Sequence, residues 1–391
     1  MPKASANGIE LFYDLSGPDG APVVVFSNSL GSTISMWDAV VPTLVGRYRC
    51  LRYDTRGHGL SGSSDRPTTI DDLATDLLSL LDSLKIEKAH IVGLSLGGMT
   101  GQALASRHPK RVASLVLIAT AAYLPPADFW HTRAATVRAD GPGGVVDQII
   151  PRWFTEGFRK RHPEAVARVR DAFMGIDRAG YARCCEAIAT MDLRDRLAKI
   201  AAPTLVMVGA DDPVTTPAMA EALCTGIPDA ELMVIANVAH LVSVERPDAV
   251  AGYLLAFLGR HDPRMFVRDD AFQKGLAVRK SVLGADYVDA ALTNAGAFGA
   301  DWQDFITRVA WGEIWGDPTL PPKTRSLLTL AIMVALHREE EFKLHLRPAL
   351  GNGVTIEELR ALIKQAAVYA GVPAANAAMR WTRDVLGEEA K

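Results

Sequence analysis

The sequence predicts an α/β domain followed by an all-helical domain, and three observations support this. Up to about residue 120, short segments rich in Val, Ile and Leu alternate with helical stretches, as in a mostly parallel sheet with right-handed crossovers. Segments of the same kind return at 204–209 and 231–235, whereas only helical patterns follow residue 262. At 391 residues the chain is long enough for two domains, which we place at 1–262 and 263–391.

The first domain is expected to open with a β-hairpin that turns at Asn7-Gly8, because that pair suits a tight turn. Further strands are expected at 23–26, 50–53 and 89–92. Before the last of these, leucines at helical spacing predict a helix that packs on the sheet. They are Leu73, Leu77, Leu80, Leu81 and Leu84.

The strand pattern breaks between about 121 and 196, where only helical pieces with scattered aromatic side chains occur. The aromatic residues are Trp130, Trp153, Phe154, Phe158, Phe173 and Tyr181. Because this block is inserted between two strands of the sheet, we expect a helical cap over the active site. Strands resume near Thr204, and 247–258 is expected to form the closing helix of the domain.

The second domain carries clear helix signals. The segment 326–336 is almost continuously apolar and is predicted to be buried. Thr355 with Glu358 three residues later forms a capping-box pattern that starts another helix. Pro373 then acts as a stop signal.

Gly93-Leu94-Ser95-Leu96-Gly97-Gly98 follows a strand-like run and opens a helical segment. A strand, a sharp turn and a helix are the context in which G-x-S-x-G forms the nucleophile elbow of an α/β-hydrolase. Small residues two before and two after the serine relieve crowding in the strained turn. We therefore predict an α/β-hydrolase fold with Ser95 as nucleophile at the positive end of a helix. A structural serine in a glycine-rich turn is the alternative.

A nucleophilic serine needs a base, and the base needs an acid that orients it. On this fold both come later in the chain, the acid first, each after a strand. His240 follows the last strand-like segment and is predicted to be the base. Asp211 and Asp212 both follow the preceding strand. We prefer Asp212, because Pro213 fixes the turn just past the strand end.

The backbone N–H groups of Leu30 and Leu96 are predicted to form the oxyanion hole. On this fold one donor lies in the loop after an early strand and the other directly follows the nucleophile. Many members of the superfamily carry His-Gly where this chain has Asn28-Ser29, a change that leaves the amide donor in place. The pattern D-x-R-G-H-G-x-S at 54–61 is interpreted as a loop-bracing element.

Composition excludes several function classes. The formal net charge is −3, so we expect no nucleic-acid partner and no anionic membrane surface. No apolar run reaches membrane-spanning length and the first residues lack a signal-peptide core, which indicates a cytoplasmic protein. The four cysteines show no disulfide or metal spacing; they are Cys50, Cys184, Cys185 and Cys224.

Each half resembles a known family over several stretches. The first half is similar to 3-oxoadipate enol-lactonases at 27–31, 93–98, 152–155, 181–188 and 239–241. The second half resembles 4-carboxymuconolactone decarboxylases at 311–315 (Trp-Gly-Glu-Ile-Trp), 323–327, 345–354 and 369–376. Both families belong to the protocatechuate, or β-ketoadipate, pathway. The resemblance therefore implies a bifunctional enzyme of that pathway.

The resemblance implies two consecutive reactions on small-molecule lactones. 4-Carboxymuconolactone loses CO₂ to become 3-oxoadipate enol-lactone, which the first half then opens to 3-oxoadipate. The conjugated lactone carbonyl can accept the electrons released as CO₂ leaves, so no cofactor is expected.

His345 lies at the position that matches the decarboxylase family and is the implied proton donor. Glu313 and Arg325 are the implied groups for polarising the substrate and binding its carboxylate. A surface histidine beside a solvated acidic run is the alternative for His345. Glu341 and His345 share a helix face, but two ligands without a third are a weak metal signal, so no metal is predicted.

In the first half, Arg133 is expected to bind the substrate carboxylate, because a guanidinium presents a planar fork of donors. Trp130 is expected beside it as an apolar wall. Arg138 and Arg152 are alternatives to Arg133.

Other interpretations lead to different functions. One is another serine esterase or lactonase, in which the helical domain serves only to form oligomers. Another is a ligand receptor that binds a small acid without turnover. A thiol peroxidase related to the second family would need a Cys-x-x-Cys pair, and that half contains no cysteine. The resemblance also implies a homo-oligomer assembled through the C-terminal domain.

Overall fold

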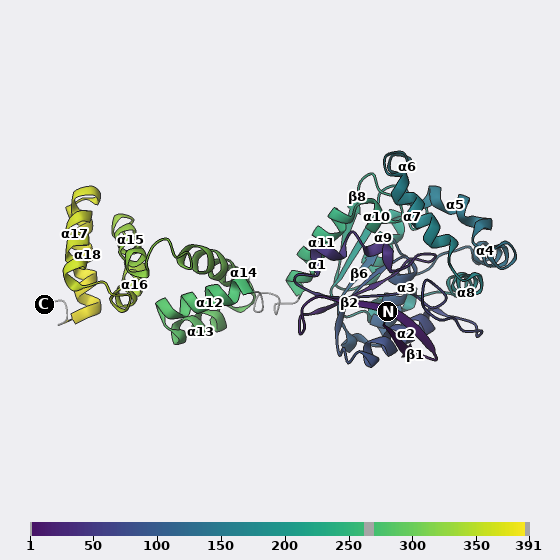
Figure 1. Cartoon of the computed structure of the whole chain (residues 1–391), viewed down its shortest axis with the longest axis horizontal. Coiled ribbons are helices and arrows are strands. Elements are labelled where there is room, and N and C mark those ends of the chain that lie inside the picture. The colour runs from purple at the N-terminus through teal and green to yellow at the C-terminus, as the bar shows by residue number, and fades with distance from the viewer. Residues whose placement is uncertain (1, 262–269, 388–391) are drawn as a thin grey trace. The chain divides into compact units, whose positions relative to one another are not determined.

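The computed structural model of the chain describes residues 2–261 and 270–387. The chain divides into two compact units, Met1–Asp262 and Pro263–Lys391 (Figure 1). The joint that the sequence places at 262–263 lies outside the described residues. Within the described ranges, no helix is long and apolar enough to cross a membrane.

The described part of the first unit contains an eight-stranded sheet in the order β1-β2-β4-β3-β5-β6-β7-β8. The strands are β1 (Lys3–Ala6), β2 (Ile9–Ser16), β3 (Val23–Ser27), β4 (Arg49–Tyr53), β5 (Ala89–Leu94), β6 (Val112–Ile118), β7 (Thr204–Gly209) and β8 (Ala230–Ile235). β1 and β2 form the expected hairpin, with Asn7 and Gly8 at positive φ. β2 pairs antiparallel with β4, and the later pairings are parallel. The predicted, mostly parallel sheet is confirmed.

Helices flank this sheet (Figure 1). Outside the cap they are α1 (Val41–Leu44), α2 (Ile70–Ser83), α3 (Leu96–Arg107), α9 (Pro217–Gly226), α10 (Val242–Glu245) and α11 (Pro247–His261), with short 3₁₀ turns at η1 (Ile34–Trp37), η2 (Pro109–Arg111) and η3 (Arg194–Lys199). Four of the five leucines predicted for the buried face of α2 are buried; Leu84, its C-cap, is half-buried.

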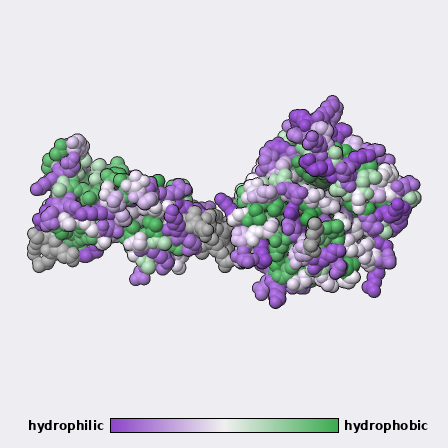
Figure 2. All heavy atoms as spheres, viewed as in Figure 1, coloured by the Kyte–Doolittle hydropathy of each residue, from purple (hydrophilic) through white to green (hydrophobic). Residues whose placement is uncertain are grey.

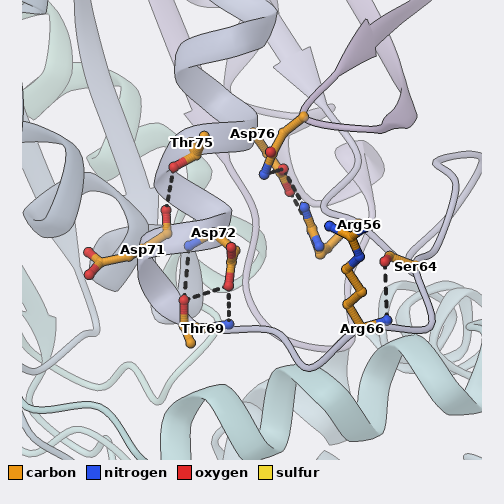
Figure 3. Close-up of polar contacts among 9 residues, drawn as sticks. Arg56, Ser64, Arg66, Thr69, Asp71, Asp72, Thr75 and Asp76 are labelled. Carbon is orange, nitrogen blue, oxygen red and sulfur yellow. Dashed lines mark hydrogen bonds and ion pairs between the residues drawn. The ribbon is translucent and has the colours of Figure 1, made fainter.

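Polar contacts fix the N-terminus of α2 (Figure 3). Asp72 N donates to Thr69 Oγ1 at 3.1 Å, and Thr69 N donates to Asp72 Oδ2 at 2.8 Å. One turn further on, the buried carboxylate of Asp76 accepts two hydrogen bonds from Arg56, at 2.6 and 2.5 Å. This buried pair ties the 54–61 loop to α2, which agrees with its interpretation as a bracing element.

Between β6 and β7 the chain forms the cap. Its helices are α4 (Ala127–Asp140), α5 (Gly143–Trp153), α6 (Glu156–Arg161), α7 (Pro163–Met174) and α8 (Arg178–Ala189). α4 packs on α8, and α5 packs on α7. An isolated bridge between Tyr123 and Asp192 joins the two ends of this insertion, so the cap has a closed base.

The described part of the second unit is helical. Its elements are α12 (Asp270–Leu283), α13 (Ala285–Asn294), α14 (Gly296–Ile306), the π-helix η5 (Thr307–Trp315), α15 (Pro322–Ala335), α16 (Glu339–Gly351), α17 (Ile356–Ala370) and α18 (Val372–Leu386). The predicted capping box of Thr355 and Glu358 begins α17. A core formed by the last four helices contains Leu330, Phe342 and Trp381.

One prediction about this unit is wrong. The apolar segment 326–336 is predicted to be buried, but Leu328, Ile332 and Leu336 are 49, 57 and 63% exposed. The opposite face of α15, which includes Leu330, enters the core. Both faces of this helix are apolar, and the unit itself covers only one of them, which leaves apolar side chains at its surface (Figure 2).

Candidate active site

Ser95 occupies the sharp turn between β5 and α3 and is 6% exposed. Its φ of 55° and ψ of −112° lie at positive φ, which a non-glycine residue rarely adopts. Ser95 N donates to Ile118 O at 2.9 Å, and Thr120 Oγ1 donates to Ser95 O at 2.7 Å. These bonds hold the strained strand–turn–helix geometry that a nucleophile elbow requires.

Gly93 and Gly97 make this turn possible. A Cβ on Gly93 would lie 2.2 Å from Gly97 O, and a Cβ on Gly97 would lie 2.1 Å from Ser27 O. Cβ atoms do not approach backbone oxygens so closely, so a larger residue at either position would displace the backbone. The close approach at Gly97 brings the first turn of α3 against the end of β3.

His240 follows β8 and is 2% exposed, and its Nδ1 lies 2.8 Å from Asp212 Oδ2. Asp212 also accepts hydrogen bonds from Thr215 Oγ1 and Val214 N, both at 2.7 Å. Burial raises the pKa of Asp212, but His240 and these hydrogen bonds outweigh it and hold the pKa below its ordinary value. Asp211 is exposed. The structure therefore pairs Asp212, the preferred aspartate, with His240.

The backbone of β4 and the side chain of Trp37 hold Asn28, which stands where many members of the superfamily have histidine. Asn28 Nδ2 donates to Tyr53 O at 2.8 Å, and Trp37 Nε1 donates to Asn28 Oδ1 at 2.9 Å. All three residues are buried. Asn28 therefore anchors the start of the loop that follows β3.

The same loop is held at its far end by His58. Gly31 N donates to His58 Nε2 at 3.0 Å, and His58 Nδ1 lies 3.0 Å from Arg56 O. Burial lowers the pKa of His58 to about 4, so the ring is neutral and can accept from Gly31. Leu30 lies between the two anchors, and Leu96 is the first residue of α3. Their backbone N–H groups remain the predicted donors of the oxyanion hole.

A cavity of about 430 Å³, counting its open mouth, lies between the cap and the ends of the strands. Its walls are Ser29, Leu30, Ser95, Phe129, Trp130, Arg133, Ile149, Arg152, Trp153, Tyr181, Ile188, Val214 and His240. The structure thus brings the predicted nucleophile, base, oxyanion loop and Trp130–Arg133 pair to one cavity. Its lining residues include two guanidinium groups and no carboxylate.

Arg133 and Arg152 reach the cavity from α4 and α5. The guanidinium carbon of Arg133 lies 4.8 Å from the centre of the Phe129 ring, and that of Arg152 lies 5.5 Å from it. Burial, followed by the nearby positive charge of Arg133, lowers the pKa of Arg152. Arg138, the other sequence alternative, is instead paired with Glu186 at 2.5 and 2.8 Å. An anion entering the cavity therefore meets Arg133 and Arg152 together.

In the second unit, His345 lies on α16 beside the π-helix η5. Its ring is nearly parallel to those of Trp311 and Trp315. The centroid of the His345 ring lies 6.3 Å from that of Trp311 and 6.5 Å from that of Trp315. Burial lowers the pKa of His345, and the nearby Glu341 opposes this effect. Among the described residues no group of three possible metal ligands occurs, at His345 or elsewhere. A π-helix is rare and is frequently found at functional sites.

The two further candidates of this unit have different surroundings. Glu313 lies on η5 and is exposed. Arg325 Nη2 donates to Asp317 O at 2.7 Å, and its Nε donates to Leu320 O at 3.1 Å. Two donor groups of Arg325 are therefore used to hold the loop before α15, which weakens its assignment to a substrate carboxylate.

Sequence reasoning missed several residues of the first site. Phe129 and Tyr181 line the cavity although neither was assigned a role, and only Tyr181 lies in a stretch that resembles the enol-lactonases. Glu245 accepts hydrogen bonds from Ala239 N at 3.0 Å and from Thr155 N at 3.2 Å. It links the His240 loop to the cap, and no local pattern marks it.

Comparison with known proteins separates the chain into the same two parts. The alpha/beta hydrolase family matches residues 24–253, and the carboxymuconolactone decarboxylase family matches residues 300–384. An enol-lactonase structure from Burkholderia xenovorans is 42% identical, with a TM-score of 0.65, and the match covers 66% of this chain and 99% of that one. The predicted fold class is confirmed.

Two curated relatives come from Acinetobacter baylyi. 3-Oxoadipate enol-lactonase 2 is 40% identical over 245 residues, which are 63% of this chain and 91% of the relative. 4-Carboxymuconolactone decarboxylase is 48% identical over 118 residues, 30% of this chain and 88% of the relative. The predicted resemblance of each half is thereby confirmed. The chain belongs to the alpha/beta hydrolase family, and its helical second half belongs to the carboxymuconolactone decarboxylase family.

Proposed function

We propose that the chain is a bifunctional enzyme that converts 4-carboxymuconolactone to 3-oxoadipate enol-lactone and then hydrolyses this lactone to 3-oxoadipate. The observation that carries the proposal is the pairing of relatives in one chain. One half is similar to an enol-lactonase and the other to a 4-carboxymuconolactone decarboxylase. Loss of CO₂ from the second enzyme's named substrate yields the substrate of the first, so the two reactions are consecutive.

In the proposed hydrolysis, Ser95 Oγ attacks the lactone carbonyl while His240 takes its proton. Asp212, hydrogen-bonded to Nδ1 of the ring, keeps the basic Nε2 available and stabilises the imidazolium that forms. The backbone N–H groups of Leu30 and Leu96 bind the oxyanion. The ring oxygen leaves as an enolate, which becomes a ketone, and water then releases 3-oxoadipate from the acyl-enzyme.

The proposed substrate carries a carboxylate that must be held away from the reacting carbonyl. Arg133 is the proposed partner, with Trp130 as an apolar wall, and Arg152 lies close enough to share the charge. The support is electrostatic, because two guanidinium groups line the cavity without a carboxylate among its lining residues. Such a cavity favours an anionic ester over a neutral one.

In the proposed decarboxylation, His345 protonates the carbon α to the lactone carbonyl after CO₂ leaves. Trp311 and Trp315 lie on the same side of its ring, nearly parallel to it, and give that side an apolar surface. A dianionic substrate beside the ring would favour the imidazolium, so the proton would be taken up as the substrate binds. Glu313 is a candidate for polarising the substrate.

We further infer that the chain forms a homo-oligomer through its second unit. The support is the exposed apolar face of α15, at Leu328, Ile332 and Leu336, together with Phe298 and Trp302 on α14. We place the enzyme in the cytoplasm, where its unpaired cysteines would stay reduced.

The proposal is tested by giving the purified full-length chain 4-carboxymuconolactone and following CO₂, enol-lactone and 3-oxoadipate. Ser95→Ala should accumulate enol-lactone while CO₂ release continues, with lactone opening slowed by ~10⁴-fold or more. His345→Ala should block CO₂ release while added enol-lactone is still opened. Wild-type lactone opening in Ser95→Ala would refute the triad, and faster turnover of simple aryl esters than of enol-lactone would favour another esterase.

A further inference from the structure

Arg279, on α12, is a buried charge that has no charged partner among the residues that the structure describes. The residue is buried, with 4% of its surface exposed. Nη1 donates to Gln303 Oε1 at 2.8 Å and to Thr307 Oγ1 at 3.0 Å, and both acceptors are neutral. Its Nε is buried and has no hydrogen-bond partner. Buried charges are ordinarily paired, because desolvation of an isolated ion is costly.

The other arginine that is buried among the described residues has an acidic partner, and so have several less buried cations. Arg56, 6% exposed, makes a two-pronged pair with Asp76. In the second unit, Lys280 lies 2.7 Å from Asp289, and further pairs join Arg308 to Asp304, Lys323 to Glu358 and Lys343 to Glu339. Among the charged side chains described in 270–387, Arg279 is the buried one. Arg279 therefore lacks the carboxylate partner that Arg56 and these lysines and arginines have.

The position of Arg279 connects it with the His345 site. One turn before it on α12, a Cβ on Gly275 would lie 2.0 Å from Thr307 O and 3.0 Å from Gly312 N, so α12 lies directly against η5. Thr307, which Arg279 contacts, begins η5, and Trp311 follows one turn later on the same helix beside the His345 ring. α12 also packs on α16, the helix of His345. Arg279 thus lies on a helix that contacts both the helix of Trp311 and the helix of His345.

We propose that Arg279 binds the carboxylate that the decarboxylase substrate keeps. This inference rests on the proposed function. The lactone carries two carboxylates on one ring carbon, one directly and one through a methylene group, and only the first departs as CO₂. A guanidinium on the departing carboxylate would stabilise the charge that must move into the ring and would slow the reaction. On the retained carboxylate it holds the ring in place without that cost.

The test compares two substrates in the full-length chain. They are 4-carboxymuconolactone and its monoester on the retained carboxylate. We expect wild type to prefer the diacid by about 100-fold in kcat/KM, as a charge-assisted pair permits. In Arg279→Met, kcat/KM for the diacid should fall by about the same 100-fold, mainly through a higher KM. For the ester, kcat/KM should change little. The matched control is Lys280→Met, because Lys280 is the next residue and is already ion-paired. This variant should keep the wild-type kcat/KM for both substrates.

Two further readouts separate binding from folding. Enol-lactone opening by the first unit should be unchanged in each variant. Arg279→Lys, which keeps the charge, should retain at least a tenfold preference for the diacid. Equal loss on diacid and ester would mean a structural role and would overturn the proposal, as would an unchanged kcat/KM. A fall in oligomer mass with an unchanged preference would assign the anion to a second copy instead.

Failure of the inference and failure of the proposed function are distinguishable. A wild-type chain that releases no CO₂ from the diacid contradicts the proposed function, and this inference falls with it. A wild-type chain that decarboxylates, beside an Arg279→Met variant that does so equally well, contradicts only the role of Arg279.

Discussion

The two units differ in how far they satisfy their own side chains. In residues 2–261 five large apolar side chains are exposed, scattered from Leu60 to Val234, whereas residues 270–387 expose thirteen. Buried charge follows the same division. Arg56 in the first unit has Asp76, while Arg279 in the second has only neutral acceptors. Exposed apolar faces and unpaired buried charge commonly mark binding surfaces and sites.

This difference indicates whether each site is complete within its own unit. The cavity of the first unit brings the predicted nucleophile and base, the loop after β3 and two cations together within one folded body. The second unit places His345 beside two tryptophans but leaves apolar faces and one cation unsatisfied. The first unit should therefore work alone, and the second should depend on what binds to it.

The largest expected effect sharpens the account of the first unit. Asp212→Asn should slow enol-lactone opening by about 10³–10⁴-fold, because the neutral amide no longer holds the imidazole in the productive tautomer. The measurement is kcat for enol-lactone, with CO₂ release from the decarboxylase half as internal reference. Asp211→Asn, a change of the exposed neighbour, is the matched control and should leave kcat unchanged. The reverse pattern would transfer the acid role to Asp211.

The next prediction concerns the apolar face of the second unit. Ile332→Glu should weaken self-association by a hundredfold or more, because a carboxylate would be desolvated in the interface. Light scattering of the full-length chain at several concentrations measures this. Enol-lactone opening should not change.

Met174→Glu is the matched control for this change. It places the same charge on an exposed apolar side chain of the cap, 45% exposed against 57% for Ile332. We expect it to leave the molar mass as in wild type. A monomeric wild-type chain, or an Ile332→Glu variant of unchanged mass, would break the comparison between the two units.

The same contrast explains what could be predicted from sequence. Ser95 could be predicted as the nucleophile because the elbow is local, with its glycines within two residues. Chain order predicted His240 and Asp212, whose side chains lie 2.8 Å apart, since this fold fixes where the acid and base follow the serine. Phe129 and Glu245 were missed because their roles depend on how the cap packs against distant loops. The face of α15 was misjudged because apolar periodicity predicts burial without naming the partner.

The smallest effect that we predict is a pH dependence in the first unit. The pKa of His58 is lowered to about 4 by burial, whereas in the unfolded chain it is about 6.5. Between these values the unfolded chain binds more protons, so stability falls as pH falls from 6.5 towards 4. Because of His58, the unfolding free energy should be about 2 kcal/mol lower at pH 5 than at pH 8.

His58→Gln isolates this contribution, because an amide oxygen can still accept from Gly31 N but does not titrate. Urea unfolding can be monitored through the loss of enol-lactone opening. Between pH 8 and pH 5 the unfolding free energy of the variant should fall by about 2 kcal/mol less than that of wild type. Equal losses would mean that His58 is not the neutral acceptor that holds the loop. The decarboxylase half, which lacks this contact, should keep its activity over the same pH range if the first unit is independent.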